Sequence, residues 1–367
     1  MNLTLSREEL LRPLQSVIGV VERRQTLPIL ANVRLALREN TLYLTTTDLE
    51  VEMQASLMLE AEHPDATVTV AARKLLDICR SLPAEANLQL TLEGGRMLVR
   101  GGRSRFMLAT LPADEFPLLD SSGSKTQVRL AQSQLRYLLE QTQIAMAQQD
   151  VRYYLNGLLL ELRRDHLRAV GTDGHRLATS EVPAVLSGET ERQIIVPRKG
   201  IVELFRLLRD TDAEATLELA DNYLRVDLGS DRFTSKLIDG RFPDYERVIP
   251  ARTTASLQVA RASLREALGR AAILSNEKYR GIRLSLTPER VSISANNSEH
   301  ESAEEELEAT YDGEAMEIGF NVGYLTDPLN VLAGSEVELR FTDANGSCLL
   351  LDPADPASRH VVMPMRL

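Results

Sequence analysis

The sequence predicts an α+β protein made of three tandem copies of one domain, each with two helices packed on antiparallel sheets. The first observation is a set of similar stretches at constant spacing: TTTDLEVEM, VGTDGHRLA and SANNSEHES place Thr47, Thr172 and Asn297 at intervals of 125 residues. The second is another recurring pair, VAARKLLDICRSL and VPRKGIVELFRLL, which starts at Val70 and Val196. The period exceeds the roughly 20–50 residues of solenoid repeats, so each copy can bury its own core.

Stretches rich in turn-forming residues mark the predicted domain boundaries. SSGSK occupies 121–125 and PARTT occupies 250–254, and both interrupt the periodic segments on either side. We therefore expect three domains, at 1–123, 124–252 and 253–367.

The first copy shows helical and strand periodicity in alternation, which is the third observation. A helix is predicted over 6–21, because Ser6 is a good cap and leucines follow at helical spacing. A second helix over 73–82 ends at Pro83. Alternating apolar and polar residues predict strands over 33–40, 41–48, 50–57, 87–95, 96–102 and 105–111.

The other two copies repeat this order. Helices are predicted over 131–146, 198–210 and 261–274, and a last one in 322–332. Strands of the second copy are predicted over 157–164, 166–174, 215–222, 223–230 and 232–238. Two helices in each copy give six helices in the chain.

Composition restricts the class of protein. Hydrophobic residues make up 43% and charged residues 26%, as in soluble globular proteins, and no apolar run reaches the roughly 18 residues of a membrane span. The start, MNLTLSREELL, is unlike a secretory signal. Cys79 and Cys348 are far apart, without a CxxC motif, which favours a reducing compartment. We expect a cytoplasmic protein without metal or cofactor.

Charge is distributed unevenly along the chain. The net charge is −11, yet the six helical windows 7–24, 72–81, 132–147, 198–209, 261–270 and 322–332 together carry 15 Lys or Arg and 8 Asp or Glu. An acidic protein with basic helices can present those helices to a polyanion. The alternative is that Lys and Arg simply favour helices.

Two short segments carry opposite charges. Arginines cluster within 96–105, where no acidic residue occurs, and glutamates cluster within 299–308, where no Lys or Arg occurs. If copies of the chain meet end to end, the basic segment of one can contact the acidic segment of another, in a heterologous contact that closes a ring or extends a filament. The alternative is a solvated acidic loop.

Long motifs give the chain a resemblance that runs from end to end. They are TLPILANV, TDLE, VAARKLLDICR, RSRF, QDVRYYLNG, TDGHRLA, VPRKG, DGRFPDYERVIP, AILSNEKYRG, EIGFNVGY and VVMPMRL. The chain resembles the bacterial DNA polymerase III beta subunit family, the sliding clamps. The resemblance implies a head-to-tail homodimer whose six clamp-type domains close into a ring around duplex DNA, with the helices lining the hole. It implies these partners: duplex DNA without sequence preference, the replicative polymerase, an ATP-driven clamp loader and other clamp-binding proteins.

The resemblance also implies three sets of site residues. Duplex contacts are expected from Arg24, Arg73, Gln149, Tyr153, Tyr154, Arg198 and Lys199. A pocket for partner peptides is expected from Leu155, Thr172, Gly174, His175, Arg176, Leu177, Pro243, Arg247, Val248, Asn321, Tyr324, Ser347, Val361, Met363, Pro364, Met365 and Arg366. A dimer interface is expected from Lys74, Arg96, Arg103, Arg105, Phe106, Ile273, Leu274, Glu299, Glu301, Glu304 and Glu305.

Other interpretations exist for parts of these sets. Taken without the resemblance, VVMPM is typical of a final core strand, and His175 in TDGH is typical of a turn residue rather than a base. Pro328 lies inside the last predicted helix, where a proline costs roughly 3 kcal/mol. Either Asp327 caps a shortened helix with Pro328 at its first position, or the helix kinks.

The sequence does not indicate an enzyme. It has no GxxxxGK[ST], GxSxG or HExxH motif, and its five histidines are scattered. We expect a processivity factor that holds DNA by encircling it. A competing hypothesis is a peptide-binding scaffold that never contacts DNA.

Overall fold

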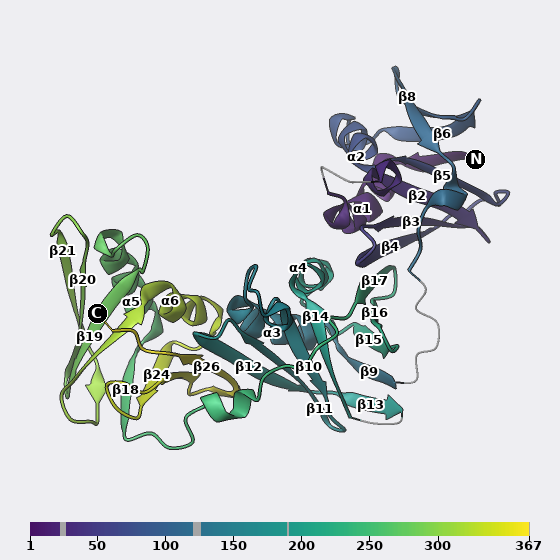
Figure 1. The fold of residues 1–367 in the computed structure, drawn as a ribbon. Coiled ribbons are helices and arrows are strands. Elements are labelled where there is room, and N and C mark those ends of the chain that lie inside the picture. The colour runs from purple at the N-terminus through teal and green to yellow at the C-terminus, as the bar shows by residue number, and fades with distance from the viewer. Residues whose placement is uncertain (23–26, 120–125, 189–190, 367) are drawn as a thin grey trace. The chain divides into compact units, whose positions relative to one another are not determined.

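The computed structural model describes residues 1–22, 27–119, 126–188 and 191–366. Contacts group them into two compact units, each drawn in Figure 1. Unit 1 comprises Met1–Ser133, Val185–Thr190 and Val202–Leu237, and unit 2 comprises the rest. Each unit contains one outer copy of the repeat and part of the central copy. The first predicted domain boundary falls outside the described residues, and the three boundaries stay a prediction.

All six predicted helices occur in the described residues. They are α1 (Arg7–Val17), α2 (Ala72–Ser81), α3 (Gln132–Thr142), α4 (Arg198–Leu207), α5 (Arg261–Ala271) and α6 (Val322–Val331). All six end one to four residues earlier than predicted, and in three of them the last predicted turn tightens into the 3₁₀ helices η1 (Ile18–Val20), η4 (Gln143–Ala145) and η7 (Ala272–Leu274). The predicted cap of α1 is confirmed as a capping box between Ser6 and Glu9.

Unit 1 contains one antiparallel sheet of 13 strands. Their order is β1 (Asn2–Ser6), β6 (Asn87–Glu93), β7 (Arg96–Gly101), β8 (Ser104–Leu111), β5 (Ala66–Ala71), β2 (Asn32–Arg38), β3 (Thr41–Thr47), β4 (Val51–Met58), β17 (Asp231–Lys236), β16 (Tyr223–Asp227), β15 (Glu214–Leu219), β9 (Thr126–Ala131) and β13 (Val185–Gly188). The β4–β17 pair joins the first copy of the repeat to the central copy through main-chain hydrogen bonds.

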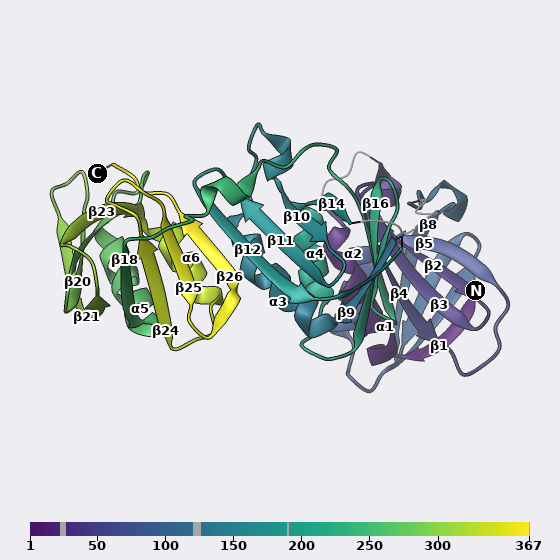
Figure 2. The same cartoon turned by 90° about the horizontal axis from the view of Figure 1, so that it is seen from below.

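Unit 2 contains two antiparallel sheets. The larger has the order β14 (Arg192–Pro197), β10 (Gly157–Leu162), β11 (His166–Thr172), β12 (Arg176–Pro183), β26 (Asp355–Val362), β25 (Cys348–Asp352), β24 (Glu336–Phe341), β18 (Ala255–Ala260) and β22 (Thr310–Tyr311). The smaller has the order β21 (Ser302–Glu308), β20 (Arg290–Asn296), β19 (Gly281–Thr287) and β23 (Met316–Asn321). Figure 2 shows β12 beside β26, the pair that joins the central copy to the third.

Paired helices are fastened in the same way in the outer copies. Arg7, the first residue of α1, donates from Nε to the carbonyl of Cys79 in α2 at 2.8 Å. Arg261, the first residue of α5, donates from Nη1 to the carbonyl of Leu329 in α6 at 2.7 Å. Cys79 and Leu329 are 250 residues apart, twice the repeat period. Each arginine therefore supplies a donor to a carbonyl near the end of the neighbouring helix, where intrahelical partners run out.

Helix α6 settles the question raised by Pro328. The helix begins at Val322, and the Asn321 side chain accepts from the amides of Gly323 and Tyr324, so the alternative in which Asp327 caps a shortened helix is wrong. Pro328 lies inside the helix and is buried. Its ring has no N–H to donate to the carbonyl of Tyr324, and the helix continues to Val331.

In the described residues, no helix combines the length and the apolarity that crossing a bilayer requires.

Candidate peptide groove and nucleic-acid interface

The turn between β11 and β12 carries four of the predicted pocket residues, Thr172, Gly174, His175 and Arg176. The Thr172 hydroxyl donates to the carbonyl of Arg176 at 2.6 Å and accepts from the amide of Gly174 at 3.1 Å. Asp173 Oδ1 accepts from the amides of His175 and Arg176 at 2.9 and 3.0 Å. Gly174 has φ +87°, a conformation that favours glycine. His175 is thus a residue of a fixed turn, as its alternative interpretation predicted.

The beginning of α6 lies against this turn. The rings of His175 and Tyr324 stack with their centroids 6.4 Å apart, and the Arg176 guanidinium lies 4.6 Å from the Tyr324 centroid. Arg176 is also bonded from Nη1 to Asp327 Oδ2 at 2.5 Å and from Nε to Asp173 Oδ2 at 3.1 Å. These contacts join β12 to α6, and they hold the Arg176 side chain in one orientation.

The last strand supplies a third side. Val361 lies opposite Leu177 in the β12–β26 register, and the amide of Met363 donates to the carbonyl of His175 at 2.9 Å. Val361 and Val362 are buried, so the core-strand interpretation of VVMPM holds for them. Met363 is 36% exposed. The chain therefore leaves the core at this point and forms a rim.

An apolar cluster connects these elements. Leu155, Leu177 and Val361 are buried together in it, and the half-buried Val248 packs on them. Ser347 precedes β25, whose Cys348 pairs with Val362, and Pro364, Met365 and Arg366 follow β26. Pro243 and Arg247 are exposed on the segment that carries Val248. All predicted pocket residues thus lie in unit 2, and we call the predicted peptide site the groove.

Two predicted duplex contacts are held in an equivalent way. Arg73 on α2 donates from Nη2 to the carbonyl of Val21, and Arg198 on α4 donates from Nη1 to the carbonyl of Met146 at 3.1 Å. Both the arginines and their acceptors are 125 residues apart. Arg73 is exposed, whereas Arg198 is half-buried, and burial lowers the pKa of its guanidinium. Each guanidinium has five N–H donors, so both retain donors for a phosphate.

Three other predicted duplex contacts lie on the loop 148–154. Tyr153 and Tyr154 meet edge to face with centroids 5.8 Å apart, and Tyr153 is 58% exposed. The loop is closed by Asn156, which donates to the carbonyl of Asp150 and accepts from its amide, both at 2.8 Å. A hydrogen bond from Arg152 lowers the pKa of Asp150 to about 2. Gln149, with φ +58°, is exposed on the same loop. Lys199 is half-buried on α4, and Arg24 lies outside the described residues.

The basic helix residues face outward from their own domains. In the described parts of the six helices, every Lys and Arg is exposed or half-buried. The cationic side chains therefore keep contact with solvent, although several, such as Arg7, Arg206 and Arg270, also bond within the chain.

The predicted interface residues lie in both units. In unit 1, Lys74 on α2 and the β7–β8 residues Arg96, Arg103 and Arg105 are exposed, and Phe106 is half-buried beside them. In unit 2, Ile273 on η7 is 77% exposed, Leu274 is half-buried, and Glu299, Glu301 and Glu304 are exposed. Glu305 differs, because it accepts from Arg270 of its own chain at 2.7 and 2.8 Å.

Comparison with known proteins identifies the family. Residues 1–120, 129–244 and 246–366 match the N-terminal, central and C-terminal domains of the DNA polymerase III beta subunit. The beta sliding clamps of Pseudomonas putida and Escherichia coli K12 are 52% and 49% identical to the chain, with 100% of each protein covered. The chain belongs to the DNA polymerase III beta subunit family.

Solved clamp structures agree with this assignment. A Pseudomonas aeruginosa sliding clamp bound to griselimycin has a TM-score of 0.97 and 50% identity, and covers 100% of both chains. A sliding clamp of Caulobacter crescentus has a TM-score of 0.91 and 38% identity over 100% of both chains. The predicted resemblance and the prediction of three clamp domains with helices on antiparallel sheets are confirmed. The family is one of processivity factors, which confirms the prediction that this clamp is not an enzyme.

Sequence reasoning missed several residues that shape these sites. Asp173 and Asp327 both bond Arg176, and Asp150 and Asn156 close the loop that carries the tyrosines. An Asp two residues before His175 is typical of an Asx turn, so Asp173 could have been found. Asp327 could not, because it lies 151 residues from its partner.

Proposed function

We propose that this clamp is a DNA polymerase processivity factor that closes into a ring as a head-to-tail homodimer and encircles duplex DNA. The observation that carries the proposal is the full-length match to sliding clamps, joined with outward-facing basic helices in an acidic chain. Cations that contact phosphates alone give affinity without reading sequence, which suits sliding. The polymerase is retained because the ring is closed around the duplex, without tight adhesion.

The groove is the proposed docking site for partner peptides. Its buried floor is aliphatic, and Met363 with Pro243 and Arg247 forms an exposed rim. Methionine adapts its shape easily, so a rim of this kind suits several partners that compete for one site. We propose that the replicative polymerase, an ATP-driven clamp loader and other clamp-binding proteins use it. The sequence has no nucleotide-binding loop of its own, so the energy for ring opening comes from a partner in the cytoplasm.

Retention on circular DNA tests encirclement. The clamp is loaded onto nicked circular DNA, and its loss is followed before and after the circle is cut once. We expect stable retention on the circle and rapid loss from the linear product. Equal rates of loss would overturn the proposal, and peptide binding without any DNA dependence would favour the scaffold hypothesis instead.

Solution mass tests the closed dimer. We expect about twice the 40.8 kDa of one chain by sedimentation equilibrium. A monomer at micromolar concentration would contradict a ring made of two chains.

A further inference from the structure

One wall of the groove is a segment with few main-chain contacts. Residues 239–250, which we call the wall segment, carry Pro243, Arg247 and Val248. Before the wall segment, the amide of Ile238 donates to the carbonyl of Ile195 at 2.8 Å. After it, the amide of Thr254 donates to the carbonyl of Phe341 at 2.8 Å. Within the described residues, the wall segment's own main-chain bonds are confined to its 3₁₀ turn η6 (Tyr245–Val248). Side chains must therefore hold it on the sheet.

Two aromatic side chains do so. Phe242 and Tyr245 are 8% and 6% exposed and belong to the same apolar cluster as the groove floor. Phe242 is held by packing alone. Tyr245 in addition donates from its hydroxyl to Glu161 Oε2 at 2.6 Å, and accepts from Arg168 Nη1 at 3.2 Å. Burial and the bond to Glu161 raise the pKa of Tyr245 to about 12, so the hydroxyl stays protonated.

Glu161 is a costly residue to bury. Its side chain is 2% exposed in the strand GLLLEL, where its neighbours are leucines. It accepts from Gln193 Nε2 at 2.5 Å, and Arg163 and Arg168 lie 3.4 and 3.5 Å away. A buried carboxylate with partners contributes little net stability, whereas it constrains the groups that bond to it. The other partners of Glu161 therefore fix its carboxylate, independently of the hydrogen bond from Tyr245.

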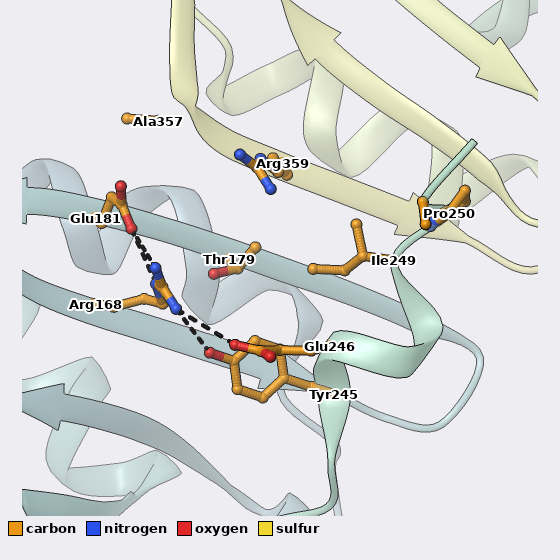
Figure 3. Close-up of a pocket in the computed structure, with 10 residues that line it drawn as sticks. Arg168, Thr179, Glu181, Tyr245, Glu246, Ile249, Pro250, Ala357 and Arg359 are labelled. Carbon is orange, nitrogen blue, oxygen red and sulfur yellow. Dashed lines mark hydrogen bonds and ion pairs between the residues drawn. The ribbon is translucent and has the colours of Figure 1, made fainter. Parts of the chain in front are cut away.

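A cavity lies beside the wall segment. It has a volume of about 420 Å³ and lies between Tyr245, Glu246, Ile249 and Pro250 and the strands that carry Arg168, Thr179, Glu181 and Arg359. Figure 3 shows Arg168 at its edge, bonded to Tyr245, Glu246 and Glu181. The cavity separates the wall segment from the facing strands, so protein side chains do not pack against the segment on this side. The hydrogen bond from Tyr245 therefore holds the wall segment in place on this side.

We propose that Glu161 and Tyr245 are positioning residues for the groove: the buried carboxylate, through the tyrosine hydroxyl, sets the place of the wall that carries Pro243, Arg247 and Val248. The inference rests on the proposed function of the groove. Neither residue contacts a bound peptide, because both are buried.

The test is peptide binding by the full-length clamp. The probe is a fluorescein-labelled peptide from the clamp-binding segment of the cognate replicative polymerase, followed by fluorescence anisotropy. Tyr245→Phe removes one oxygen and keeps the ring, and we expect the Kd to rise about five-fold, the usual effect of one hydrogen bond. Glu161→Gln keeps an acceptor for the hydroxyl, so this variant should bind the peptide nearly as tightly as the natural clamp. Glu161→Leu removes the acceptor, so its Kd should rise as in Tyr245→Phe.

Tyr311→Phe is the matched control. Tyr311 is also buried, at 4% exposed, and its hydroxyl donates to the carbonyl of Glu314 at 2.8 Å. It lies on the edge strand β22, which β18, β24 and β25 separate from β26 in the sheet. It should lower the melting temperature about as much as Tyr245→Phe and leave the Kd unchanged. Unchanged affinity in Tyr245→Phe, or an equal loss in both variants, overturns the inference. If the natural clamp itself fails to bind the probe, it is the proposed function of the groove that fails.

Discussion

At the scale of single residues, several arginines have two tasks. Arg73 and Arg198 each donate to a carbonyl at the end of the preceding helical segment, and each retains donors for a phosphate. Arg176 bonds two aspartates and lies over Tyr324. Loss of any of these side chains therefore changes structure and binding together, and the two effects must be measured separately.

Replacement of Arg73 by Gln should weaken DNA binding without altering sequence preference. One phosphate contact fewer lowers the slope of log affinity against log salt by about one. The lost bond to the carbonyl of Val21 should cost about 1 kcal/mol of unfolding free energy. Salt titrations of binding to a DNA duplex measure the first effect and urea unfolding the second. Arg283→Gln, the same charge change on strand β19, is the control; an equal loss of salt slope there would contradict the assignment.

His360 should make the clamp sensitive to acid. Burial, with Arg176 nearby, lowers the pKa of His360 to about 4, and its ring meets Gln141 Oε1 at 3.3 Å. Because an unfolded histidine titrates near 6.5, the unfolded state takes up the proton first, so stability is complete above pH 6.5 and falls as pH drops toward 4. The loss is about 3 kcal/mol. Urea unfolding between pH 4 and 7 measures it, and His360→Asn should flatten the profile; an unaltered slope would show that another group is responsible.

At the scale of elements, caps and turns place the functional side chains. Asn321 starts α6 and thereby orients Tyr324, which stacks on His175. Asp173 closes the turn that presents His175 and Arg176. The periodicity of the sequence predicted the helices and most strands around them, because periodicity is a local property. The contacts between α6 and the 172–177 turn join residues about 150 positions apart, and periodicity carries no information about them.

Asn321→Ala should loosen the start of α6. The loss of a side-chain cap costs about 1 kcal/mol, and the freed first turn should weaken binding of the polymerase peptide. Asn321→Asp keeps the acceptor and loses only the donor to the carbonyl of Tyr279, so it should retain most of the affinity. Thermal unfolding and anisotropy measure the two quantities. Equal losses of affinity in both variants would mean that the bond to Tyr279, not the cap, matters.

At the scale of the whole molecule, opposite charges and the exposed side chain of Ile273 suit an interface between chains. The arginines of β7 and β8 are exposed in unit 1, and Ile273 with three glutamates is exposed in unit 2. Glu305 is already paired with Arg270 within its chain, so it has less to offer a partner. A contact between the two different ends is heterologous, and two such contacts close a ring.

Changing Ile273 and Leu274 together to Ala should weaken the dimer. Truncation of a buried aliphatic side chain costs about 2–5 kcal/mol, and both side chains are expected to be covered in the ring. Sedimentation velocity at nanomolar concentration should show monomers where the natural clamp stays dimeric. Leu118→Ala, a change at an exposed leucine outside the predicted interface, is the control. An unchanged sedimentation profile for the double variant would show that Ile273 and Leu274 do not belong to the dimer interface.

The sequence alone determined the threefold repeat, the six helices, the uneven charge and, through its motifs, the family. It determined these because periodicity, composition and motif order are properties of neighbouring residues. The tertiary structure decided that Asn321 rather than Asp327 caps α6 and that Glu305 pairs with Arg270 of its own chain. It also decided that the buried Glu161 accepts a hydrogen bond from Tyr245 of the wall segment. Hydrogen bonds between distant residues form where the folded chain brings two atoms within about 3 Å of each other. The local pattern of apolar and polar residues does not determine that distance.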